Sequence, residues 1–183
     1  MFVVRTSGRS AAVDNDRREF SLLGKRDFSG LALARPISAG VRSRAVLELQ
    51  QNYGGLRFSA LVGGEFAPGE GDRLAWRVRF WETVWPTPQQ GLLRSALLPG
   101  LPEELDHAAA DGLHALTSGA LPAGQLVIDR AGYDHDSPPM LFATAAELLL
   151  HILLGGAFGS PAEPVIRSWV ATGRIAADLP RFG

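Results

Sequence analysis

The chain has no cysteine among its 183 residues. Disulfide bonds, thiolate metal sites and a cysteine nucleophile are therefore excluded. A chain without cysteine fits the reducing cytoplasm, and a cytoplasmic location is the expectation. The first residues, Met1 to Arg5, contain no apolar stretch long enough for a secretory signal peptide.

Sequence signals of catalysis are missing as well. Neither the nucleotide-binding pattern Gly-x-x-x-x-Gly-Lys-Ser/Thr nor the nucleophile elbow Gly-x-Ser-x-Gly occurs. The tightest group of metal-ligand types is Asp134-His135-Asp136, and no partner ligands with metal-site spacing accompany it. We expect a protein that is not an enzyme and that holds no metal and no cofactor.

A long uninterrupted hydrophobic run is also lacking. The longest apolar region, Met140 to Phe158, is broken by Glu147, His151 and glycines. This composition predicts a helix buried in the protein core and not a membrane span.

Lysine is nearly absent. Lys25 is the single lysine, and the other seventeen of the 18 basic residues are arginines. The net charge is -1, so no overall positive field favours nucleic acid. A high-GC codon bias explains so many arginines, but guanidinium groups also stack on bases and grip phosphates bidentately. Composition alone leaves both explanations open.

Three segments alternate between apolar and polar residues, as half-buried strands do, at about 45–50, 56–62 and 74–80. The third has an apolar face and a face of arginines, which includes Arg77 and Arg79. Gly63-Gly64 and the segment from Pro68 to Asp72 are expected to form turns. Residues 38–53 also permit a helix ending at Gly54.

The second half of the chain predicts helices at about 102–118 and 139–154, with a short strand at 125–129 between them, and a short terminal helix at 165–171. The order β-β-β-α-β-α predicts an α+β two-layer sandwich, with helices on one face of a mixed sheet. Residues 1–40 are expected to be an N-terminal extension of short strands and loops. Residues 41–183 are expected to be one domain with its core at about 44–155.

Several short motifs follow one another within this predicted core. They are Gln51 with Gly54-Gly55, Pro68 to Gly71, Leu101 to Leu105, Ser118 to Leu121, Tyr133 to Ser137, and Phe142 to Ala146. In this order and context they resemble domain IV of translation elongation factor G and the ribosome-protection proteins, a unit of the ribosomal protein S5 second-domain type. The GTPase domain of that family is absent from this sequence.

The resemblance implies a stand-alone, non-catalytic domain that touches ribosomal or other structured RNA, without GTP-driven translocation. In the family the loop tips contact RNA backbone. The matching positions are Gly54, Gly55, Tyr133, His135, Asp136 and Ser137. Glycines permit close approach to phosphate, and Tyr and His rings stack on splayed bases. The arginine face of Arg57, Arg77 and Arg79 is expected to lie nearby.

Ordinary structural roles compete with these assignments. Gly54-Gly55 also fits a plain hairpin turn, and the polar loop at 132–139 fits one in which Asp136 or Ser137 caps the next helix. The carboxylates of Asp134 and Asp136 would repel phosphate.

Two other functions stay open from the sequence. Tyr53-Gly54-Gly55-Leu56 followed by an apolar helix is similar to SUKH-type immunity proteins, which bind protein partners. That alternative requires residues 38–53 to be helical. The third possibility is a small-molecule-binding domain in which Tyr133 and His135 line a pocket. The sequence does not specify an oligomeric state.

Overall fold

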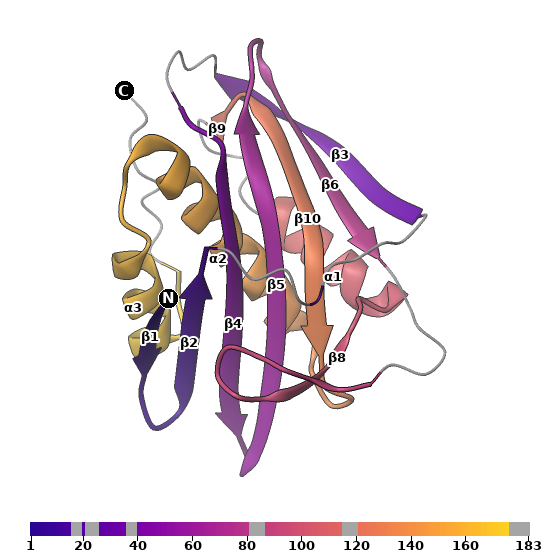
Figure 1. Ribbon diagram of the computed structural model, residues 1–183, viewed down its shortest axis with the longest axis vertical. Helices are drawn as coiled ribbons and strands as arrows, with labels where there is room; N and C mark the ends of the chain where they lie inside the picture. The colour runs from indigo at the N-terminus through magenta and orange to yellow at the C-terminus, as the bar shows by residue number, and fades with distance from the viewer. Residues whose placement is uncertain (16–19, 21–25, 36–39, 81–86, 115–120, 176–183) are drawn as a thin grey trace.

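The computed structural model describes residues 1–15, 20, 26–35, 40–80, 87–114 and 121–175. It is an α+β structure in which three helices pack on one face of a mixed sheet (Figure 1). The strands are β1 (Phe2–Arg5), β2 (Arg9–Asp14), β3 (Arg26–Arg35), β4 (Ser43–Tyr53), β5 (Leu56–Pro68), β6 (Arg73–Phe80), β7 (Gln89–Gln90), β8 (Ala96–Pro99), β9 (Leu121–Pro122) and β10 (Gly124–Tyr133). The helices are α1 (Glu103–His114), α2 (Pro139–Phe158) and α3 (Glu163–Thr172).

The sheet has the order β1-β2-β4-β5-β10-β6-β3-β9. Antiparallel pairing joins β4, β5 and β10, whereas β10 and β6 are parallel and are connected through α1. The predicted order β-β-β-α-β-α is therefore confirmed for β4, β5, β6, α1, β10 and α2. Strands from the first 35 residues extend this core at both edges, because β2 pairs with β4 and β3 pairs with β6.

The main core lies between the sheet and the helices. Helix α2 packs under β4 and β5, α1 packs on α2 and β6, and α3 packs beside β1 and β2. Alternate residues of each strand face these helices, for example Leu47 and Leu49 on β4 and Trp76 and Val78 on β6. We call this helix-covered side the inner face of the sheet and the opposite side the outer face.

By length and hydropathy alone, α2 would pass as a membrane-crossing helix, and 72% of its most apolar 18-residue window is buried inside the protein. The buried core helix of a folded domain passes the same test, as predicted for this region.

A smaller apolar cluster lies on the outer face, under the segment that contains β7 and β8. This segment crosses the ends of β4 and β5 on the side away from the helices (Figure 1). Its Leu92, Leu93 and Leu97 pack with Ala12, Phe20, Val46 and Leu61. The carboxylate of Glu48 is fully buried beside this cluster and accepts a hydrogen bond from the Leu93 amide at 2.7 Å and another from the Ser95 hydroxyl.

Some local predictions were wrong. Gly63 and Gly64 lie inside β5 and form no turn; a Cβ on Gly64 would come within 2.1 Å of the Val127 carbonyl oxygen. β10 continues to Tyr133, so the polar loop starts two residues later than predicted. Ser43–Tyr53 is a strand, and the helix required by the SUKH-like alternative is absent there. The chain between β6 and α1 contains β7 and β8, which the sequence did not predict. The predicted end of the first helix, 115–118, lies outside the described residues.

Candidate functional site

The β4–β5 hairpin ends in the predicted glycine turn. Tyr53 pairs with Leu56, and between them Gly54 and Gly55 have φ angles of 60° and 83°. Both angles lie in the left-handed region, where glycine alone is free of steric cost, and two consecutive positive φ values fit the two-residue turn of a twisted hairpin. A Cβ on either glycine would meet no atom within 4 Å, so the tip is open to an approaching surface.

The loop after β10 is hydrogen-bonded to β5 at Ser59. Asp134 accepts a hydrogen bond from the Ser59 amide at 2.9 Å. Ser137 is buried, and its hydroxyl lies within hydrogen-bond distance of the Ser59 carbonyl and, at 2.6 Å, of the Asp134 carboxylate. Both oxygens of the Asp134 carboxylate therefore have hydrogen-bond donors within the protein.

The helix-capping role considered for Asp136 and Ser137 is wrong. The N-cap position of α2 is Pro138, and no side chain caps the helix there. Asp136 is exposed, and its amide donates to the Asp134 carboxylate at 3.2 Å. Ser137 therefore orders the loop against β5, while the Asp136 side chain is left at the surface.

The rings of Tyr133 and His135 contact each other edge to face, with centroids 6.4 Å apart and planes at 89°. His135 is exposed, whereas Tyr133 is half-buried and packs against the main core. A ring that stacks on a base has to face solvent, and His135 meets this requirement better than Tyr133 does. A stacking role is thus geometrically open to His135 and restricted for Tyr133.

The glycine tip and the Tyr133–His135 pair share one end of the sheet without touching. Tyr133 pairs with Ala60 on β5, and Gly55 lies five residues before Ala60, in the turn that precedes this strand. At about 3.3 Å per residue, the tip projects roughly 16 Å beyond Tyr133. This end of the protein therefore has two contact points and not one compact site.

Arg77 and Arg79 do not join this end. Both lie on the outer face of β6 beside Asp27 of β3, with nitrogen–oxygen distances of 3.4 Å and 3.9 Å. Arg77 stands opposite Val127, six residues before Tyr133, which is roughly 20 Å along the strand. The single arginine face expected from the sequence is therefore divided between two regions of the sheet.

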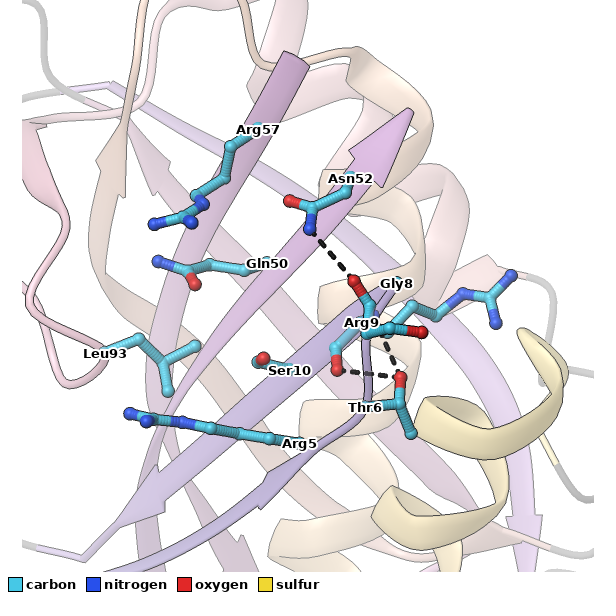
Figure 2. A pocket seen from close by; sticks show the side chains of 10 residues that line it. Arg5, Thr6, Gly8, Arg9, Ser10, Gln50, Asn52, Arg57 and Leu93 are labelled. Carbon is cyan, nitrogen blue, oxygen red and sulfur yellow. Dashed lines mark hydrogen bonds between the residues drawn. The ribbon is translucent and has the colours of Figure 1, made fainter. Parts of the chain in front are cut away.

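Arg57 remains with the hairpin. It pairs with Asn52 near the tip, is exposed, and forms no ion pair among the described residues. Beside it lies a cavity of about 300 Å³ whose lining includes Arg5 of β1 and Gln50 of β4 (Figure 2). Sequence reasoning gave Arg5 no role, because the pairing partners of the first strand cannot be read from alternation alone.

Shifted pKa values fall on the helices and not on this end of the sheet. Burial lowers the pKa of His151 and raises the pKa of Glu147, both on α2. Burial also raises the pKa of Asp106, whereas a hydrogen bond with the Glu103 carbonyl raises the pKa of the neighbouring His107. Within the described ranges no three His, Asp or Glu side chains are placed to hold a metal ion.

Three cavities formed by described residues do not have Tyr133 or His135 in their lining. These three cavities give the small-molecule alternative no support. Comparison with protein-family models, curated proteins and solved structures gave no match.

Proposed function

We propose that this protein is a non-catalytic domain that contacts structured RNA, such as that of the ribosome, through the end of the sheet that carries the β4–β5 hairpin and the β10–α2 loop. The proposal also keeps a cytoplasmic location and the resemblance to elongation factor G domain IV as its premises.

One observation carries it: an uncommitted, exposed Arg57 stands behind an open glycine tip, at the end of the sheet where His135 is also exposed. Backbone without side chains can approach a phosphate closely, and a guanidinium group behind it supplies charge. Asp134 supports the same reading because its carboxylate is bound by the Ser59 amide and the Ser137 hydroxyl. One of the two charges that opposed RNA in the sequence is thus satisfied inside the loop, whereas the Asp136 carboxylate stays exposed.

The test is co-sedimentation with ribosomes over a range of salt concentrations. Wild-type protein should bind at low salt and dissociate as salt rises, because released counterions drive phosphate contacts. His135→Ala should weaken binding by about 1–3 kcal/mol if the ring stacks on a base. Arg57→Ala should lower the dependence of log K on log salt by about 1.

Arg44→Ala is the matched control, because Arg44 lies on the same sheet but is paired with Glu65 at 2.5 Å. Its binding should equal that of the wild type. Absence of sedimentation with ribosomes at every salt concentration would remove the RNA proposal. Equal losses for Arg57→Ala and Arg44→Ala would show that the contact does not involve this end of the sheet.

A further inference from the structure

The cavity beside Arg57 is built from two distant parts of the sequence. It lies on the outer face, at the end of the sheet where the β1–β2 hairpin meets β4 and β5. Its lining includes Arg5, Ser10, Gln50, Asn52, Arg57 and Leu93. Arg5 and Ser10 come from the N-terminal strands, outside the predicted core at 44–155.

Strand register explains why these side chains meet. Arg5 pairs with Ser10, Ser10 with Gln50, and Gln50 with Ser59, so the four form one row across β1, β2, β4 and β5. Arg57 precedes Ser59 by two residues on β5 and so points to the same face. Three strand spacings of about 4.8 Å separate Arg5 from Ser59, roughly 14 Å.

Two long arginine side chains lean inward from the sides of this row. In Figure 2 the guanidinium groups of Arg5 and Arg57 extend toward the same side as Gln50 and Leu93. The guanidinium group of Arg9 extends away from them, toward α3, and its NH2 atom would lie 2.5 Å from a Cβ on Gly173. The cavity therefore receives two cationic groups and not three.

Neither Arg5 nor Arg57 is neutralised within the described part of the chain. Neither takes part in an ion pair there, and no aspartate or glutamate lines the cavity. Ser10 adds a hydroxyl donor between them. Glu48 lies two residues from Gln50 on β4, and its carboxylate accepts hydrogen bonds from the Leu93 amide and the Ser95 hydroxyl. Its charge weakens anion binding but is partly satisfied by these donors.

The walls of the cavity are held in place before any ligand binds. Leu93 is fixed by its bond to Glu48, and Gln50 donates to Ser95 at 2.5 Å. On the other side, the Thr6 amide donates to the Arg9 carbonyl at 2.7 Å, and Asn52 donates to the Ser7 carbonyl at 3.1 Å. These bonds order the β1–β2 turn against β4, so only the arginine side chains lose freedom when they bind.

We propose that this cavity binds a phosphate group, held between the guanidinium groups of Arg5 and Arg57 with the Ser10 hydroxyl as a further donor. Guanidinium forks match the oxygen geometry of phosphate, and two of them provide the charge for a mono- or dianion. The phosphate can come from an RNA backbone or from a small phosphorylated molecule. The N-terminal strands thus supply half of a binding site that the core alone lacks.

The first experiment titrates ¹⁵N-labelled full-length protein with inorganic phosphate at constant ionic strength, followed by amide chemical shifts. Saturable shifts are expected at Ser10, Gln50 and Asn52. Arg5→Gln and Arg57→Gln should each weaken the binding at least tenfold. Arg44→Gln, whose arginine is paired with Glu65 on the same face, should bind as the wild type does. Unchanged thermal melting of each variant establishes that it is folded.

A second arm replaces inorganic phosphate by a short single-stranded RNA. If Arg5→Gln loses binding of both inorganic phosphate and RNA, the RNA backbone is the source of the phosphate. If it loses binding of inorganic phosphate alone, the cavity binds a small phosphorylated ligand, and the proposed phosphate site stands. Phosphate binding that is absent, or equal in Arg5→Gln, Arg57→Gln and Arg44→Gln, overturns the proposal. His135→Ala separates the two proposals, because it should weaken RNA and leave inorganic phosphate unchanged.

Discussion

Two groups of arginines lie on the outer face of one sheet and differ in their neighbours. Arg42 and Arg44 contact Glu65 at 2.9 Å and 2.5 Å, and Arg77 and Arg79 lie within 4 Å of Asp27. Arg57, with Arg5, forms no ion pair within the described residues. Acidic partners on the sheet neutralise the first group, whereas Arg57 and Arg5 leave positive charge available at one end of the sheet.

Strand register produces this difference. Arg44 stands opposite Glu65 in the β4–β5 pair, and Arg79 stands opposite Asp27 in the β3–β6 pair. Residues directly opposite each other on antiparallel strands share a face and come within contact distance. Arg57 stands opposite Asn52, and Arg5 stands opposite Ser10, so neither has a carboxylate across from it. A chain with net charge -1 can therefore still present a local cationic site.

Glu48 is the buried carboxylate that fixes Leu93 at the wall of the cavity. Glu48→Ala should destabilise the protein by about 3 kcal/mol, because the Leu93 amide and the Ser95 hydroxyl lose a charged acceptor in a buried place. Urea denaturation measures the change.

Glu65→Ala is the matched control for this prediction. Glu65 is partly exposed, and its pairs with Arg42 and Arg44 reach solvent, so its loss should cost less than about 1 kcal/mol. Equal costs for the two variants would contradict the distinction between a buried structural carboxylate and a surface ion pair.

A buried histidine of α2, the helix that packs on the inner face, should affect stability less than Glu48 does. Its replacement should stabilise the protein instead of destabilising it. His151 of α2 is 5% exposed, and its Nε2 atom has no hydrogen-bond partner among the described residues. Burial lowers the pKa of His151, so the folded protein holds this proton less tightly than the unfolded chain does. Stability should therefore fall as pH decreases below about 6.5, the ordinary histidine value.

His151→Leu should raise the free energy of unfolding by about 1 kcal/mol at neutral pH, because an unsatisfied polar atom is replaced by apolar volume. It should also flatten the stability profile between pH 7 and pH 5. Denaturation curves at several pH values test both parts. A variant that is less stable than the wild type at pH 7 would show that His151 is satisfied in the native core.

Hydrophobic periodicity in the sequence was enough to predict the fold, but it did not predict the cavity between Arg5 and Arg57. The alternation around Leu47 and Leu49 predicted β4, and the apolar run from Met140 predicted α2, because burial sets those patterns directly. Gly64 was misread as a turn, since crowding against the Val127 carbonyl and chain reversal both favour glycine. Arg57 and Arg5 are 52 positions apart in the sequence, and only the pairing of four strands brings them together.

Asp27 is the shared acidic partner of Arg77 and Arg79. Its replacement should have the smallest effect on stability and should test directly whether acidic partners distinguish the two groups of arginines. Asp27→Asn should change stability by less than about 1 kcal/mol, because the contacts with Arg77 and Arg79 are 3.4 Å and 3.9 Å long and partly exposed. It should nevertheless leave two cationic groups unneutralised on β6. Retention on a phosphocellulose column should therefore increase, with elution at higher salt than the wild type. The added retention should persist in the double variant with Arg5→Gln, because the two regions are independent. Unchanged retention of Asp27→Asn would mean that a missing carboxylate is not what distinguishes Arg57 and Arg5 from the other arginines of this face.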